Sequence, residues 1–404
     1  MPSGGKNRLW LAGIIALGLA LRIANAETAL LHDDEKTHAA SDAMWSLSRL
    51  SVAEAVRFLR EHPRDHPHLY PMRGLVEPWA VTKGSAAFWG HPALSSFVTG
   101  LVFAVVCPET PEGAVRTARY VNVAADTAAL ALLPSLVGAL GAGEAAGLLA
   151  AALYAVFPLA VSSSSIAYFD PLLAPLMVLL VRALARLSSI EAVERLRSWI
   201  ATGVLSGLLI STKETGLVVL ASVPIAALAM PHPRIRGLAA WALATAALVV
   251  VFTSPSAYLE RLAEPPDPAA RMQVAPLAQL VGNLRMLATP LDHFWIGWTK
   301  HGSPRAPLLS RLNVYVAPVY TWGALAAAAL ALVRRDLRVL LLVVPPIALT
   351  LAAVPVTGSV RRLQLIAPLL CALIACEWPR LSRRARIVTL AACLLYTSPS
   401  PRDS

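Results

Sequence analysis

The sequence predicts an all-α membrane protein that crosses the bilayer many times. Of its 404 residues, 56% are hydrophobic, and the mean hydropathy of +0.60 is higher than a soluble domain of this size sustains. Apolar stretches of about 17–22 residues recur along the chain, and this length matches the thickness of a bilayer core. The net charge of +11 comes mainly from arginines in short segments between the stretches, which indicates cytoplasmic loops rather than a nucleic-acid partner.

About eleven of these stretches are expected to cross the membrane. The twelve apolar stretches, one of which is not counted as a crossing, fall at about residues 9–24, 92–107, 118–140, 145–166, 171–187, 199–211, 216–230, 238–254, 313–333, 338–356, 362–377 and 387–395. Basic residues precede the first stretch and follow the fifth, seventh, ninth and eleventh, so these sites are expected on the cytoplasmic side. They include Lys6, Arg8, Arg182, Arg186, Arg195, Arg197, Arg234, Arg236, Arg334, Arg335, Arg338, Arg380, Arg383, Arg384 and Arg386.

The number of crossings between Lys6 and Arg182 must be even if both are cytoplasmic. The stretch at 91–106 is short and begins with His91-Pro92, so we expect it to be an interfacial or re-entrant helix on the outer face. The alternative is a genuine span with a different topology. If the 91–106 stretch does not span, residues 25–117 form one large outer loop, with surface helices over 36–49 and from Ser51 to Pro63.

Three acids, Asp33-Asp34-Glu35, lie just outside the first apolar stretch. Acids favour the first turn of a helix, so they also suit the start of the 36–49 helix. Because they lie at the membrane surface, a carboxylate there can instead take a proton from an acceptor hydroxyl. Asp170 has the same two interpretations: an N-cap before Pro171, or a second acid on the same face.

Lys213 lies in GLLISTKETGLVV, where a polar break separates two apolar segments and faces outward by parity. With Thr212 and Thr215 it suits a phosphate site; the alternative is a snorkelling lysine paired with Glu214. Arg119 starts the next crossing after the 91–106 helix, and it either pairs with an anionic headgroup or anchors the helix at the interface.

A divalent metal on His91 with Asp33, Asp34 or Asp170 stays open as an alternative, but the spacing of these residues does not support it. No metal site and no cofactor are therefore assigned. The four cysteines show no metal-like spacing and indicate no disulfide framework.

Together and in this order, these features resemble the GT-C glycosyltransferases, in particular the dolichyl-phosphate-mannose protein mannosyltransferases and the aminoarabinose transferases of lipid A. The resemblance covers roughly residues 8–230, and the GSVRRLQLIAPLL segment at 358–370 resembles a late segment of these enzymes. The sequence departs from the pattern at Ala93, where a second proline is usual, and at Gly90, where the aminoarabinose transferases have an acid. The matching residues are Asp34-Glu35, His91-Pro92, Arg119, Asp170-Pro171 and Thr212-Lys213.

The resemblance implies a GT-C-like bundle with a large first outer loop carrying interfacial helices. It implies an inverting transfer of a sugar from a polyprenyl-phosphate donor to a hydroxyl of a protein, lipid or glycan, on the outer face of a bacterial plasma membrane. Asp34 would be the general base, with Glu35 and Asp170 in the same catalytic site. The donor phosphate would be held by Lys213, Arg119, His91, Arg361 and Arg362.

The resulting division of the chain has a catalytic transmembrane region at 1–256, a second outer loop at 257–312 and a C-terminal transmembrane region at 313–395. Residues 396–404 break the compositional pattern and are expected to be translated adapter sequence. The first stretch lacks a cleavage site and is expected to stay as an anchor. The alternative function is a lipid or ion transporter or flippase, which predicts acids inside spans, with Asp126 as the candidate.

Overall fold

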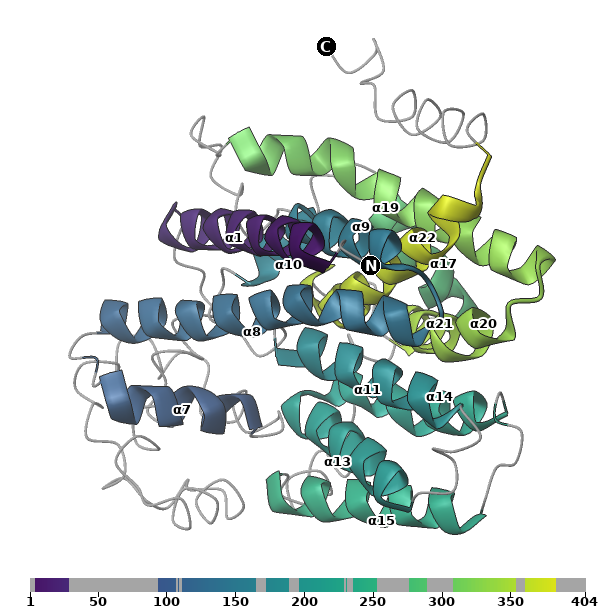
Figure 1. Cartoon of the computed structure of the whole chain (residues 1–404). Coiled ribbons are helices and arrows are strands. Elements are labelled where there is room, and N and C mark those ends of the chain that lie inside the picture. Colours follow the sequence, from purple (N-terminus) through teal and green to yellow (C-terminus); the bar gives the residue numbers. More distant parts are fainter. Residues whose placement is uncertain are drawn as a thin grey trace.

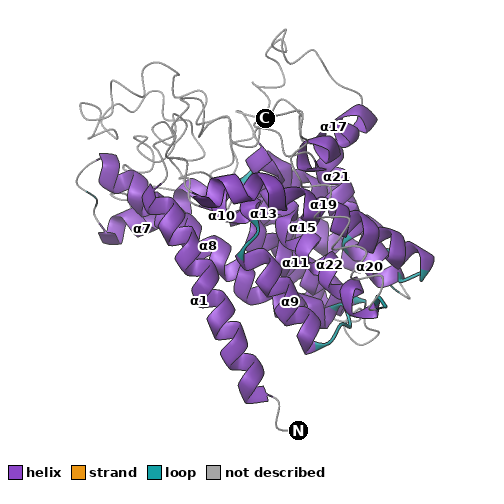
Figure 2. Ribbon diagram, turned by 90° about the horizontal axis from the view of Figure 1, so that it is seen from above, coloured by secondary structure: helices purple, strands orange, loops and turns teal. Residues whose placement is uncertain are grey.

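The computed structural model describes residues 4–28, 94–106, 108, 111–164, 172–188, 196–228, 230, 235–252, 276–288, 308–353 and 360–382. Every regular element in these ranges is a helix, which confirms the all-α class (Figures 1 and 2). The apolar stretches expected in these ranges all form helices, several of them broken into two pieces.

The longer helices are α1 (Gly4–Thr28), α7 (Leu94–Val106), α8 (Pro111–Ala139), α9 (Glu144–Ala155), α11 (Leu173–Leu187), α13 (Leu196–Thr212), α15 (Ile235–Phe252), α17 (Pro276–Ala288), α19 (Leu308–Val333), α21 (Val344–Ala353) and α22 (Ala367–Glu377). The shorter pieces are α10 (Pro158–Ser164), η4 (Glu214–Val218), α14 (Val219–Ala227), α20 (Leu337–Leu342), η6 (Val360–Ile366) and η7 (Trp378–Arg380). The helix α17 lies in the segment expected as the second outer loop, and it packs against α21 and α19.

Helices α1 and α8 lie side by side and run in opposite directions. Near the end of α1, Arg22 contacts Asp126 at the middle of α8, whereas Asn7 near the start of α1 donates a hydrogen bond to Glu144 just after α8 ends. Helix α9 then returns alongside α1, because Arg22 also reaches the carbonyl oxygen of Ala155 at its end. The chain therefore alternates in direction from one helix to the next.

This alternation gives the bundle two ends. We call the end where α1 stops and α8 begins the site end; α10 stops there, α11 begins there, and α7 and α10 lie toward it in Figure 2. We call the opposite end the basic end, because the described basic residues assigned to the cytoplasm follow the alternation to that side. They are Lys6, Arg8, Arg182, Arg186, Arg197, Arg236, Arg334, Arg335, Arg338 and Arg380.

Helices approach each other closely at small residues. This is common in membrane proteins, because in lipid the hydrophobic effect does not drive helices together. Gly203 and Gly207 bring α13 against α15. A Cβ atom at Gly203 would lie 2.5 Å from the carbonyl oxygen of Trp241, and one at Gly207 would lie 3.0 Å from that of Thr245. Larger side chains at these two positions would push the helices apart.

Among the described residues, 4 helices are long and apolar enough to cross a membrane: Gly5–Glu27, Gly113–Ala139, Ile235–Phe252 and Leu363–Arg380. Helix α7 has 13 residues and is therefore about 20 Å long, shorter than a bilayer core. The residues directly before and after this helix lie outside the described ranges, so whether the stretch spans the membrane stays a prediction. Its interfacial position, and the total of about eleven spans, remain predictions.

Candidate functional site

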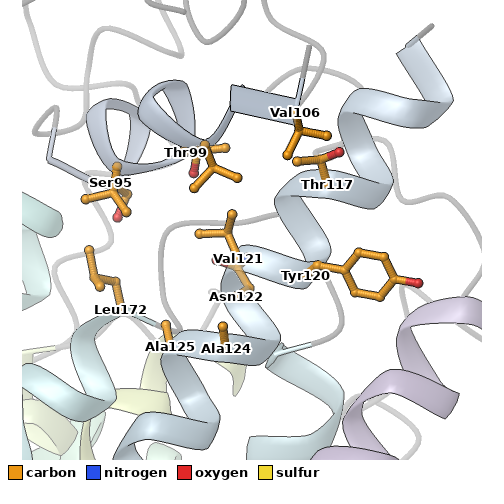
Figure 3. Close-up of a pocket in the computed structure, with 12 residues that line it drawn as sticks. Ser95, Thr99, Val106, Thr117, Tyr120, Val121, Asn122, Ala124, Ala125 and Leu172 are labelled. Atoms are coloured by element: carbon orange, nitrogen blue, oxygen red, sulfur yellow. The ribbon is translucent and has the colours of Figure 1, made fainter. Parts of the chain in front are cut away.

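A pocket of about 520 Å³ opens between α7 and α8 at the site end (Figure 3). Its walls are mostly valine, alanine and leucine side chains, with a few hydroxyl and amide groups among them. The polar members include Thr99 on α7 and Asn122 on α8, and Figure 3 shows Thr99 facing Val121 across the pocket. A cavity of this size and apolar character suits a hydrophobic ligand that carries a polar group.

Leu172, the residue before α11, closes one side of this pocket. Asp170 precedes it by two residues in the sequence and lies outside the described residues. Leu172 already has helical dihedral angles, and the residues before it lie outside the described ranges, so the expected N-cap at Asp170 stays a prediction. The role of Asp170 as an acid of the site stays a prediction.

Lys213 lies at the break between α13 and η4, as the sequence predicts. Its side chain is buried, with 3% of the residue exposed, and its backbone is extended where the helix stops. The chain turns back at once, because the N–H of Gly216 donates to the carbonyl of Lys213 at 2.8 Å. A Cβ at Gly216 would lie 2.3 Å from the carbonyl oxygen of Leu209, so this turn requires a glycine.

This break lies at the site end. Helix α13 begins near Arg197 at the basic end and stops at this break. The helix η4 contacts η6, and Gln364 in η6 donates a hydrogen bond to Asp126 at the middle of α8. Arg361 and Arg362 belong to η6, but their side chains lie outside the described part of the chain. The backbone thus brings the lysine segment and the double-arginine segment to neighbouring helices.

Arg119 lies more than two turns inside α8, which begins at Pro111 rather than near Arg119. It is buried, and its guanidinium donates a hydrogen bond of 2.7 Å to the carbonyl of Ala26 in the last turn of α1. A cation there complements the free carbonyls and the negative end of the helix dipole. Arg119 therefore holds the end of α1, and its contact with a donor phosphate stays a prediction.

A second contact joins the same helix ends at the surface. Arg116 pairs with Glu27 at 3.0 Å, and the hydroxyl of Tyr120 donates to the same carboxylate. In Figure 3 Tyr120 points away from α7, so its ring borders the pocket while its hydroxyl serves the junction of α1 and α8. This surface cluster is balanced in charge.

A buried ion pair joins the same two helices deeper in the bundle. The Nε of Arg22 lies 2.6 Å from Oδ2 of Asp126, and both side chains have 0% exposure. The hydroxyl of Tyr154 donates to Oδ1 at 2.5 Å, and the amide of Gln364 donates to the same oxygen at 2.6 Å. Both oxygens of Asp126 thus have partners, which favours a fixed structural group over the proton carrier that a transporter would need.

The sequence does not predict this network. Arg22 lies within the apolar stretch expected at 9–24 and has no predicted partner, and Asp126 is predicted only as a candidate for transport. The signal is present nonetheless, because charges inside apolar helices are rare and pair with one another. Arg22 in the first helix and Asp126 in the next long one are natural partners on that rule.

Four of the predicted site residues, Asp34, Glu35, His91 and Asp170, lie outside the described residues. Their roles, and the alternative of a divalent metal on His91 and the acids, remain predictions. Lys213 and Arg119 are described, buried, and at the same end of the bundle.

The chain is similar in sequence to a known family over the segment that carries this geometry. Residues 90–258 match the family model described as dolichyl-phosphate-mannose-protein mannosyltransferase. The resemblance to the GT-C glycosyltransferases is confirmed. The matched segment contains the pocket, Arg119 and Lys213, as well as His91 and Asp170. Asp34, Glu35 and the two arginines of η6 lie outside it.

Two solved structures of glycosyltransferases share the fold. One is ArnT from Cupriavidus metallidurans bound to undecaprenyl phosphate, with a TM-score of 0.54 and 14% identity over 97% of this chain and 63% of that one. The other is the oligosaccharyltransferase AglB from Archaeoglobus fulgidus, in complex with an inhibitory peptide and a dolichol-phosphate, with a TM-score of 0.50 and 12% identity over 97% of this chain and 55% of that one. No curated protein sequence matches the chain.

The chain thus spans less than two thirds of the length of either protein. At this level of identity the likeness establishes the fold, a GT-C-type helical bundle. The expectation of an enzyme of the glycosyltransferase class agrees with both the family match and the fold.

Proposed function

We propose that the chain is an inverting glycosyltransferase that moves a sugar from a polyprenyl-phosphate donor to an acceptor hydroxyl on the outer face of the membrane. The observation that carries this proposal is the placement of an apolar pocket and a buried lysine at the same end of a GT-C-type bundle. A polyprenyl-phosphate has the same two parts, a branched hydrocarbon chain and an anionic head.

The pocket between α7 and α8 suits the first isoprenoid units of the donor. Val98 and Val102 on α7 and Val121 on α8 supply branched apolar walls. Its volume is about 520 Å³, which holds only part of such a chain, so the remainder would extend along the bundle into lipid. The amphipathic lining of Thr99 and Asn122 suits the boundary where hydrocarbon gives way to phosphate.

Lys213 supplies positive charge where the leaving phosphate becomes a dianion. A cation held in a dry, fixed position stabilises developing charge better than one in water, because it needs no reorganisation during the reaction. Arg119, His91, Arg361 and Arg362 are the further groups proposed to contact the phosphate. Because phosphate is a good leaving group, the site needs no strong general acid.

Asp34 is the proposed general base. Its carboxylate takes the proton of the acceptor hydroxyl while the oxygen attacks the anomeric carbon, opposite the phosphate oxygen. The bond from carbon to that oxygen breaks, its electrons remain on the phosphate, and the configuration at the carbon inverts. Glu35 and Asp170 are proposed to shape the same site. The divalent metal is not needed for this step.

Two substitutions test the proposal with separate measurements. The purified protein in nanodiscs should bind undecaprenyl phosphate, read as a rise in its melting temperature, and Lys213→Met should remove that rise while Lys213→Arg retains part of it. Asp34→Asn should bind the lipid normally but lose about 10²–10⁴-fold in transfer, assayed with a panel of polyprenyl-phosphate-linked hexoses and pentoses.

Lys6→Gln, at the basic end, is the matched control and should change neither measurement. The proposal is wrong if the wild-type protein binds undecaprenyl phosphate no better than phosphatidylglycerol. The base assignment alone is wrong if Asp34→Asn transfers sugar at the normal rate.

A further inference from the structure

The enclosed charge network around Asp126 joins four elements of the bundle. Beyond its bond to Asp126, the guanidinium of Arg22 donates to the carbonyls of Gly18 at 2.9 Å and Ala155 at 3.1 Å. It also donates to the carbonyl of Tyr154 at 3.2 Å. With Tyr154 and Gln364 bonded to Asp126, the network links α1, α8, α9 and η6 through one carboxylate.

Three of these elements, α1, α8 and η6, lead directly to parts of the proposed site. Arg22 lies in the last two turns of α1, the helix that leads toward Asp34 in the sequence. Asp126 follows Ala125 and lies one turn after Asn122, and both of those residues line the pocket. Gln364 lies in η6 with Arg361 and Arg362. The network therefore fixes α1, α8 and η6 at positions close in sequence to the residues proposed for the chemistry.

A glutamine at position 364 is not the residue that would give the highest stability. It is fully buried, and its Nε2 bonds to Asp126. Within the part of the chain that the structure describes, its Oε1 accepts no hydrogen bond. A buried acceptor without a partner lowers stability, and an apolar side chain of the same size would avoid that loss.

The buried ion pair of Arg22 and Asp126 also indicates a role in positioning rather than in stability. Replacing a buried ion pair by apolar side chains of similar volume is often neutral or stabilising. What such a pair adds is a fixed geometry, because its hydrogen bonds hold only at one arrangement of the helices. Arg22 and Asp126, each with directed bonds to neighbouring elements, set the position of η6 against α1 and α8.

We propose that Arg22, Asp126 and Gln364 are positioning residues that set η6 and its arginines in register with the pocket and with the end of α1. This inference rests on the proposed function for its catalytic consequence. The amide of Gln364 is the part of the network that η6 contributes, so its removal should displace η6 without leaving a charge unpaired.

The test uses Gln364→Met in the full chain, because methionine has a similar volume and no polar group. The melting temperature should stay close to that of the wild type, while kcat for transfer falls about 10–100-fold and KM for the donor stays within about twofold. Amide hydrogen exchange should rise in peptides that cover 360–366. Glu377→Gln is the matched control: it removes a buried charge that pairs with Arg334 and Arg380 at the basic end, and should leave kcat and the exchange of η6 unchanged.

Unchanged kcat and unchanged exchange in η6 would overturn the inference. If the wild-type protein transfers no sugar, the proposed function falls, and hydrogen exchange alone decides whether the network fixes η6. Should Gln364→Met fail to fold, the double variant Arg22→Met/Asp126→Leu, which removes both charges together, carries the same two measurements and the same criteria.

Discussion

Two charged networks among the described residues differ in their surroundings: one is enclosed in the bundle, and the other is open at the basic end. In the enclosed network Arg22 and Asp126 are both inaccessible. In the open one, Glu377 has 1% side-chain exposure, but its partners Arg334 and Arg380 have 35% and 39%. The two networks use the same chemistry in different surroundings, so they should respond differently to substitution.

The open network is built as a clamp at the surface. Glu377 accepts from Arg334 at 2.9 Å and from Arg380 at 2.8 Å, and Asp336 accepts from the same Arg380. Asp336 is also the N-cap of α20, where its side chain accepts from the N–H of Val339. Water reaches the arginines, so the loss of one partner leaves them solvated. The enclosed network has no such compensation.

The largest effect is expected from breaking the enclosed pair on one side. Asp126→Leu leaves Arg22 buried with its main partner gone, and this should cost about 3–5 kcal/mol of stability. The double variant Arg22→Met/Asp126→Leu removes both charges and should recover most of that loss. Thermal unfolding in detergent measures both variants. A double variant less stable than Asp126→Leu alone would show that the pair contributes net stability.

The contrast between the two networks also marks what the sequence predicts and what it does not. The break at Lys213 follows from the sequence because threonine, lysine and glutamate interrupt an apolar run. The alternation of direction follows from the arginine-rich segments. Neither rule says which helices become neighbours, so the bond between Arg22 and Asp126, 104 residues apart, needs the folded structure.

Helix α17 shows a second limit of prediction from the sequence, because this helix was not expected. Its apolar residues Leu277, Leu280, Val281 and Leu284 follow a helical spacing, but Leu277 and Val281 are exposed while Asn283 is buried. The surrounding proline-rich segment and the glutamine, asparagine and arginine within the helix hide that pattern in a scan for spans. Arg119 is a third case: the sequence predicts it at the start of a crossing, but it lies more than two turns inside α8, and its bond to Ala26 needs the folded structure.

A smaller effect is expected at the open network. Glu377→Leu removes the carboxylate that joins Arg334 to Arg380 and should cost about 1 kcal/mol, because both arginines remain in contact with water. Transfer activity should stay at the wild-type level. Unfolding measured at low and high salt checks the assignment, since the wild-type clamp should weaken with salt and the variant should respond less. If Glu377→Leu lost as much stability as Asp126→Leu, the open and enclosed networks would not differ in their contribution.

The smallest effect is expected at the junction of Glu27 and Arg116, whose side chains are 38% and 65% exposed. This pair joins the same two helices as Arg22 and Asp126, so exposure is the main difference between them. Arg116→Gln should leave the melting temperature unchanged within measurement, because solvent screens the pair and the deeper bonds keep α1 on α8. Arg119→Gln, which removes the buried bond to Ala26, should lower the melting temperature more. Equal shifts in the two variants would mean that burial does not set the strength of the contacts between α1 and α8.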